Sequence, residues 1–144
     1  MHEETGADEL VQFFDTKVHP IETALCIPEP DQDGNGKVLF LGLDGGPYFG
    51  GYFSPLDAFG DGEFGYPSNE MEMLYINTAM GTVGNPHVIA HEFQHLLYLE
   101  RHGLQVDNDW NYHNEGLSEC AVRAVLGENE ISWQTYMGDP ALGE

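Results

Sequence analysis

The sequence predicts one α+β domain in which a small, twisted, mostly antiparallel sheet packs on two helices. Three observations support this fold class. The chain has 144 residues, of which 41% are apolar, so it can bury one hydrophobic core of ordinary domain size. Residues 37–43 and 70–77 are short runs of the kind found in strands. Two segments with helix-capping signals follow them.

The first element expected is a short helix over residues 7–14. Apolar residues recur there with helical spacing, and they would form its buried side: Leu10, Val11, Phe13 and Phe14. A turn-rich segment is predicted next, because three prolines follow: Pro20, Pro28 and Pro30.

The sheet is predicted from the middle of the chain. Residues 31–36, Asp-Gln-Asp-Gly-Asn-Gly, are a strong turn signal, and residues 37–43 are typical of a buried strand. Residues 44–69 are rich in Gly and aromatic residues, which indicates a long ordered loop. Residues 70–77 are then expected to form the second strand.

The helix after this strand has clear boundary signals. Asn85 is a suitable N-cap, and Pro86 suits the first helical position. The helix is expected to continue over residues 87–100, with Gly103 ending it. Four apolar residues would anchor it in the core: Ile89, Phe93, Leu96 and Leu97.

A second helix is predicted over residues 114–126, after a linker rich in Asp and Asn. Gly127 would close it, and residues 131–137 could add a last helical turn or two. No internal repeat is visible, so residues 1–144 are predicted to form a single minimal domain.

The charge of the chain limits its partners. Twenty-five Asp and Glu residues face four Lys and Arg residues, which gives a formal net charge of −21. Such a surface repels nucleic acid and anionic membranes, and it suits a cation better. Most of this charge is interpreted as a solubilising acidic surface, because specific cation sites would use only a few carboxylates.

The sequence also bears on the compartment. It shows neither a signal peptide nor an apolar stretch long enough to span a bilayer. We expect a secreted protein whose leader has been removed, with a cytoplasmic protein as the alternative.

The cysteines, Cys26 and Cys120, form no Cys-x-x-Cys pair, so they do not indicate a thiolate zinc site. A disulfide between them is left open by the sequence.

The predicted helix over residues 86–100 contains the pattern His-Glu-x-x-His. His91 and His95 are four residues apart, so both imidazoles lie on one helical face and can converge on one metal ion. Glu92 is rotated by about 100° from His91, so it can reach a water molecule at the metal without being a ligand. The alternative is a pair of solvent-facing histidines on an amphipathic helix.

A catalytic zinc site requires a third protein ligand. An extended pattern would place a glycine and a third histidine further along the same segment, but Tyr98 and Arg101 occupy those positions. The other source is a carboxylate from the following helix, and Glu115 would complete a two-His, one-Glu site. Glu119 lies one turn further on and could accept the other ring N–H of a ligand histidine.

These motifs resemble those of a known group of enzymes. His-Glu-x-x-His together with Asn-Glu-x-x-Ser-Glu, residues 114–119, resembles the gluzincins, the thermolysin-like clan of metallopeptidases. The 24-residue step from His91 to Glu115 is similar to the thermolysin arrangement. The strings around both motifs look closer to the hyicolysin-like neutral zinc metallopeptidases, as do residues 51–55 and 68–75.

The resemblance, which covers residues 31–124, implies a zincin-like fold and a zinc endopeptidase that acts on a protein or peptide substrate. One Zn²⁺ ion would be held by three ligands: His91, His95 and Glu115. Glu92 would be the general base. The resemblance also implies that Glu119 bonds to His91 and that Asn114, which opens the second motif, lies beside the ligands.

The end of the chain departs from the thermolysin-like pattern. In those enzymes a His, with a Tyr, steadies the oxyanion, and the His belongs to a C-terminal subdomain. This chain ends 25 residues after Glu119, so that subdomain is expected to be absent or rudimentary. Three residues could replace its histidine, although each could equally be a core or surface aromatic: Tyr112, His113 and Tyr136.

Three functions are consistent with these motifs. The first is a zinc endopeptidase, the second a zinc-binding module that holds a peptide or partner without cutting, and the third a zinc hydrolase of non-peptide esters or amides. Glu92 favours an enzyme, because a pure binding site has no need of a base. Residues 72–77 could be a substrate-facing edge strand, with an ordinary core strand as the alternative.

A second cation signal lies in the turn before the first strand. Asp31, Asp33 and Asn35 alternate and are followed by Gly36, which resembles the opening of a calcium-binding loop. The loop would end at Gly42, where a bidentate glutamate is expected. The alternative to Ca²⁺ is a tight turn held by side-chain hydrogen bonds.

Overall fold

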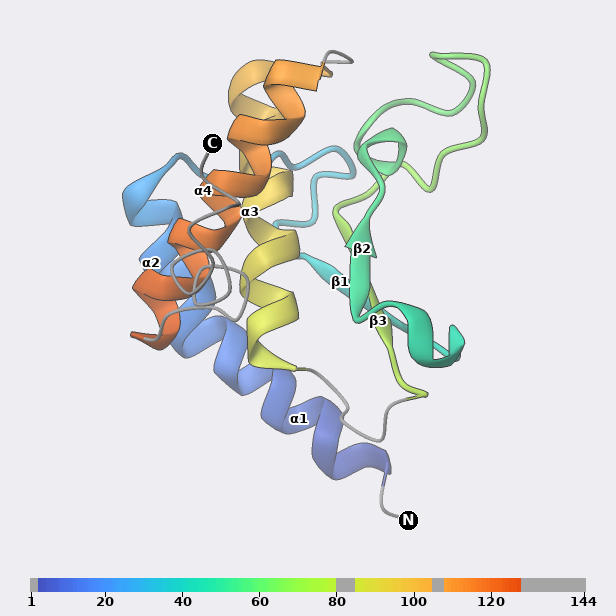
Figure 1. Ribbon diagram of the computed structural model, residues 1–144. Helices are drawn as coiled ribbons and strands as arrows, with labels where there is room; N and C mark the ends of the chain where they lie inside the picture. Colours follow the sequence, from blue (N-terminus) through green and yellow to red (C-terminus); the bar gives the residue numbers. More distant parts are fainter. Residues whose placement is uncertain (1–2, 80–84, 105–107, 128–144) are drawn as a thin grey trace.

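The computed structural model describes residues 3–79, 85–104 and 108–127 (Figure 1). Their elements are, in chain order, α1 (Glu3–Phe13), the π-helical turn η1 (Phe14–Val18), α2 (His19–Leu25), β1 (Leu39–Leu43), the 3-10 turn η2 (Gly46–Tyr48), β2 (Gly51–Phe53), the 3-10 turn η3 (Pro55–Ala58), β3 (Met73–Asn77), α3 (Pro86–His102) and α4 (Asn108–Leu126). The α-helices gather on one side of a three-stranded sheet, so the predicted α+β class is confirmed.

The N-terminal helical run is longer than predicted. α1, η1 and α2 follow one another without a break, whereas the sequence indicated a helix over residues 7–14 and then turns. Pro20 stands at the start of α2, directly after the π-helical turn in which the His19 N–H bonds to the Phe14 carbonyl oxygen. Val11 was expected on the buried side but is 47% exposed. The buried positions repeat every four residues: Leu10, Phe14 and Val18.

The sheet is mixed rather than mostly antiparallel. Its strand order is β1-β3-β2, with β1 parallel to β3 and β2 antiparallel to β3. The sequence missed β2, which has only three residues and lies in the segment predicted to be loop. Pairing direction depends on the connection between strands, so it was not determined by the two strand patterns alone.

The positions of the outer and central strands also differ from expectation. β3 is central and all five of its residues are buried, so the prediction of a substrate-facing edge over residues 72–77 is wrong. β1 is an edge strand. Leu39 and Leu41 are 47% and 43% exposed, so the expectation of a buried strand over residues 37–43 is also wrong.

α3 is the helix around which the other elements pack. It contacts α4, β2, β3 and η1. Its boundaries follow the prediction: the Asn85 side chain accepts a hydrogen bond from the His87 N–H at 3.1 Å, and Gly103 ends the helix with a φ of 69°. The four predicted anchor residues are all 0% exposed: Ile89, Phe93, Leu96 and Leu97.

α4 begins at Asn108, six residues before the predicted start at residue 114. Asp and Asn are favoured at helix starts, so the Asp- and Asn-rich stretch interpreted as a linker is compatible with a first helical turn. Gly127 closes the helix as predicted, with a φ of 72° and its N–H bonded to the Arg123 carbonyl at 2.8 Å. The predicted turns over residues 131–137 lie outside the described residues.

Two glycines allow β2 to lie close to α3. A Cβ at Gly51 would lie 2.6 Å from the Tyr75 carbonyl oxygen and 2.7 Å from the Val88 side chain. A Cβ at Gly50 would also lie 2.7 Å from Val88. The absence of side chains at both positions therefore permits the close approach that brings Phe53 to the helix carrying the two histidines.

Two further sequence questions are answered within the described residues. Cys26 and Cys120 are both free and exposed, so the disulfide that the sequence left open is not formed. None of the helices described is both long and apolar enough to cross a membrane.

Candidate metal centre

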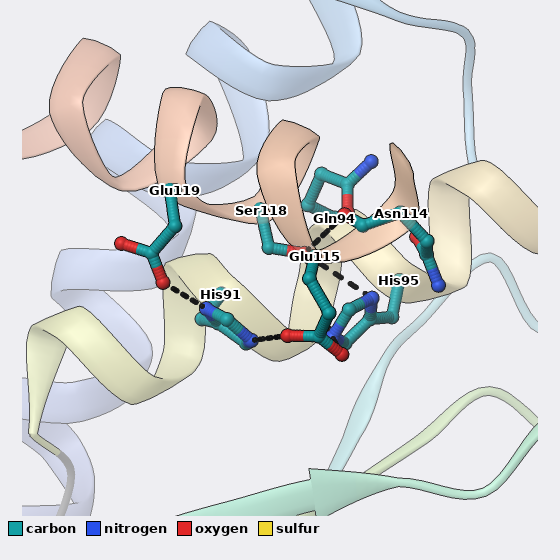
Figure 2. Close-up of polar contacts among 7 residues, drawn as sticks. All are labelled: His91, Gln94, His95, Asn114, Glu115, Ser118 and Glu119. Atoms are coloured by element: carbon teal, nitrogen blue, oxygen red, sulfur yellow. Dashed lines mark hydrogen bonds and ion pairs between the residues drawn. The ribbon is translucent and has the colours of Figure 1, made fainter. Parts of the chain in front are cut away.

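Two histidines of α3 and a glutamate of α4 point toward one another, as Figure 2 shows. His91 Nε2 lies 3.3 Å from Glu115 Oε2, and His95 Nε2 lies 3.6 Å from Glu115 Oε1. One ligand atom from each of the three residues lies within 4.8 Å of the others, so this group could hold a metal ion. These are the three residues that the sequence predicted as ligands.

The distances between the two His Nε2 atoms and the Glu115 oxygens fit the coordination shell of a metal better than a set of hydrogen bonds. Ligand atoms bonded to a tetrahedral zinc at about 2.0–2.1 Å lie about 3.4 Å from one another. Hydrogen bonds from N–H to oxygen are shorter, with donor–acceptor distances near about 2.9–3.0 Å. Two imidazoles and one carboxylate are also a donor set that catalytic zinc uses, with a fourth position left for water or substrate.

The helical spacing produces this convergence. His91 and His95 are one turn apart on α3, and their ring centroids lie 4.8 Å apart with an interplanar angle of 83°. The two imidazole side chains are only 18% and 12% exposed, whereas that of Glu115 is 52% exposed. The group is therefore anchored in the protein on the α3 side and reachable from solvent at Glu115.

Each histidine is also contacted through its other ring nitrogen by α4 (Figure 2). His91 Nδ1 lies 3.3 Å from Glu119 Oε1. Ser118 Oγ lies 3.2 Å from His95 Nδ1 and 3.4 Å from His95 Nε2. The shorter contact, with Nδ1, leaves Nε2 free to face Glu115. Holding Nδ1 in this way orients both Nε2 atoms toward the same point.

A buried polar layer between α3 and α4 supports these contacts. Ser118 is 0% exposed, Gln94 2% and Asn114 6%. Ser118 Oγ lies 2.6 Å from Gln94 Oε1 and 3.0 Å from the Asn114 carbonyl oxygen. Asn114, which was expected beside the ligands, thus enters the layer through its main chain. Ser118 and Gln94 were not predicted as site residues, although both lie within the two motifs.

Glu92 is not one of the three converging residues, but it is close enough to His95 and Glu115 for their charges to act on it. It is half-buried, and the Phe53 backbone N–H donates a hydrogen bond to its carboxylate. Burial raises the pKa of Glu92, and Glu115 raises it further, whereas His95 and the Phe53 N–H lower it. A carboxylate whose pKa is moved toward neutrality is suited to exchange protons.

The environment of His91 favours its neutral form. Burial lowers the pKa of His91, and the neighbouring His95 lowers it further, while Glu115 acts in the opposite direction. A neutral imidazole has a free lone pair, which a histidine needs in order to bind a metal.

Two of the three predicted oxyanion residues lie at exposed positions of α4. Tyr112 lies near the start of α4 and is 80% exposed, with its ring 5.9 Å from that of His113. His113 is exposed as well. Tyr136 lies outside the described residues.

The predicted calcium residues are arranged differently from an EF-hand loop. Asp31 and Asp33 converge with the carboxylate of Glu72. The Asn35 N–H donates to Asp33 Oδ1 at 3.0 Å, its side-chain amide also bonds to Asp33, and the Gly36 N–H donates to Asp31 Oδ1 at 2.9 Å. The side-chain hydrogen bonds expected of a tight turn are therefore present, and Glu72, which the sequence did not indicate, adds a third carboxylate.

Comparison with known proteins finds no matching family model, no matching curated protein and no matching solved structure. The function of the chain is therefore inferred from the motif residues and from the geometry that brings them together.

Proposed function

We propose that this chain is a zinc-dependent endopeptidase whose metal is held by His91, His95 and Glu115. The observation that carries the proposal is the convergence of these three side chains beside Glu92, a half-buried carboxylate on the same helix. The resemblance of both motifs to those of gluzincins supports the same assignment.

Zinc, when bound, supplies Lewis-acid chemistry that polarises the scissile carbonyl and makes the attacking water more acidic. The carboxylate of Glu92 accepts a proton from that water and delivers it to the nitrogen of the leaving amine. The Phe53 N–H holds this carboxylate in place from β2, and Glu119 and Ser118 hold the two imidazoles from α4.

The environment of Glu92 favours catalysis over metal binding alone. Burial raises the pKa of Glu92 although His95 and the Phe53 N–H act against it, so this half-buried carboxylate is costly as a purely structural element. A site that only binds gains nothing from this arrangement. A hydrolase of peptides or of other acyl groups gains a base next to the attacking water.

β2 is the edge strand that lies beside α3, so we place an extended substrate along it. Tyr52 at its centre is 41% exposed and stacks on Tyr75 with a centroid distance of 4.3 Å. The net charge of −21 attracts basic peptides more strongly than acidic ones.

The test is hydrolysis by protein that has been stripped of metal and then reloaded. We expect cleavage of casein and of fluorogenic peptides to vanish with the metal and to return with one equivalent of Zn²⁺. Zinc binding without any hydrolysis would favour the binding module. Hydrolysis of a p-nitrophenyl ester without peptide cleavage would favour the non-peptide hydrolase.

A further inference from the structure

A second group of acidic side chains lies where the turn over residues 31–36 meets the start of β3. One carboxylate oxygen each from Asp31, Asp33 and Glu72 lies within 4.8 Å of the others. The two aspartates are exposed, whereas Glu72 is 1% exposed. None of these residues belongs to the His91, His95 and Glu115 centre.

The buried member of this group has an unused oxygen. Glu72 Oε1 accepts a hydrogen bond from the Gln32 N–H at 2.8 Å. Glu72 Oε2 is buried and has no hydrogen-bond partner among the residues that the structure describes. A buried carboxylate oxygen without a partner is energetically costly, so its position against two further carboxylates points to a ligand that it would bind.

Across residues 3–79, 85–104 and 108–127, no Lys or Arg forms an ion pair with any of the three carboxylates. Burial raises the pKa of Glu72, the Gln32 N–H lowers it, and Asp33 and Asp31 raise it further. A bound cation would remove this repulsion.

The turn holds its carboxylates in position before any ion binds. Asp31 Oδ1 accepts the Gly36 N–H at 2.9 Å, and Asp33 is held by Asn35. Next to them, the Leu39 N–H donates to the Glu72 carbonyl oxygen at 2.7 Å, which ties the strand after the turn to the residue before β3. Such pre-ordering lowers the entropic cost of binding.

We propose that Asp31, Asp33 and Glu72 bind one Ca²⁺ ion, which fastens the turn over residues 31–36 to the start of β3. The donors are all hard carboxylate oxygens, which suit Ca²⁺ or Mg²⁺ rather than zinc. Ca²⁺ accepts irregular shells of mixed carboxylates and waters, and the exposed aspartates leave room for water. Mg²⁺ requires a smaller, near-ideal octahedron and gives up its water molecules reluctantly, so we expect it to bind these three carboxylates more weakly than Ca²⁺.

The experiment is calorimetric titration of the zinc-loaded protein with CaCl₂ in calcium-free buffer at physiological ionic strength. We expect one saturable Ca²⁺ site per chain and a rise in Tm on saturation. The same titration with MgCl₂ controls for screening of the large negative charge and should give weaker binding. Absence of a saturable step, or equal affinity for Mg²⁺, would overturn the proposal.

Two variants locate the site. Glu72→Gln should lose the saturable step, whereas Glu9→Gln, which removes an exposed carboxylate of α1, should keep it. If Glu72→Gln does not fold, the exposed Asp33→Asn replaces it and should also lose the step. Unchanged binding in these site variants would contradict the proposal. Zinc content and peptide cleavage, measured on the same samples, report on the other centre independently.

Discussion

The Nδ1 atom of His91 lies 3.3 Å from Oε1 of Glu119, and the opposite ring nitrogen lies 3.3 Å from Glu115. The His91 imidazole on α3 therefore lies between two carboxylates that both belong to α4. The two carboxylates have different tasks, because Glu115 shares the ligand group with His95 and Glu119 orients the ring from behind.

Glu119→Gln should weaken zinc binding by about 10–100-fold, since the ring loses a charged acceptor that both orients it and raises its basicity. Competition against a chromogenic chelator measures this affinity. Glu100→Gln, on an exposed face of α3, is the matched control and should bind zinc normally. Equal zinc affinities of the two variants would show that Glu119 does not support the zinc site.

Ser118→Ala should destabilise the protein by about 1–3 kcal/mol, because the buried Gln94 Oε1 would lose its hydroxyl partner. It should also weaken zinc binding, because His95 would lose its contact. Urea unfolding of the metal-free protein and zinc affinity report these two effects separately. Thr16→Ala removes an exposed hydroxyl bonded to the Gln12 carbonyl and should change neither quantity appreciably. A Ser118→Ala protein with normal stability would contradict the role of the layer.

Gly51→Ala should move β2 away from α3, because the added Cβ would meet the Tyr75 carbonyl oxygen at 2.6 Å. We expect a loss of about 1–3 kcal/mol in stability from overpacking. Hydrolysis should fall further than stability explains, because the Phe53 N–H would no longer hold Glu92. Gly60→Ala is the control, since its Cβ would lie 3.6 Å from the Glu63 carboxylate, an ordinary van der Waals distance. Full activity in Gly51→Ala would show that this contact is dispensable.

Glu22 is a buried acid outside both cation sites. It continues the four-residue spacing of Leu10, Phe14 and Val18 onto α2 and is 1% exposed. Neither carboxylate oxygen has a hydrogen-bond partner within the described part of the chain. Burial raises the pKa of Glu22 to about 9 from an ordinary value of 4.5, so the folded protein keeps this group protonated at neutral pH.

The contribution of Glu22 to the stability of the protein should therefore fall as pH rises from 4.5 to about 9. Over that range the unfolded chain releases the Glu22 proton while the folded chain retains it. Glu22→Gln removes this penalty and should be more stable than wild type by about 3 kcal/mol at pH 7, with little difference at pH 4. Urea unfolding at both pH values measures this difference in free energy of unfolding, with Glu9→Gln as the exposed control. If the difference does not grow between pH 4 and pH 7, Glu22 is not held protonated in the folded protein.

The parts of the fold that depend on local signals could be predicted from the sequence. The bounds of α3 follow from the Asn85 cap and Gly103, and both signals act within one helical turn. β2 could not be predicted, because three residues carry no pattern. The helical run through Pro20 was missed because proline usually indicates a turn or a helix end, and no local pattern indicates the π-helical turn before it.

Residues of the two candidate cation sites could likewise be predicted only where a local sequence signal indicates them. His91 and His95 follow from helical spacing, and Glu115 follows from the motif on the next helix. The contact of Ser118 with Gln94 joins residues 24 apart, and that of Gln32 with Glu72 joins residues 40 apart. Contacts at such separations arise from packing between elements, which no local pattern records.

The most direct test of the central claim combines zinc content and peptide hydrolysis in Glu92→Gln. This variant should retain one zinc per chain, because Glu92 is outside the ligand group, and its kcat should fall by about 10²–10⁴-fold through loss of the general base. Glu100→Gln should retain both zinc and turnover. Full turnover in Glu92→Gln, or loss of its zinc, would contradict the account.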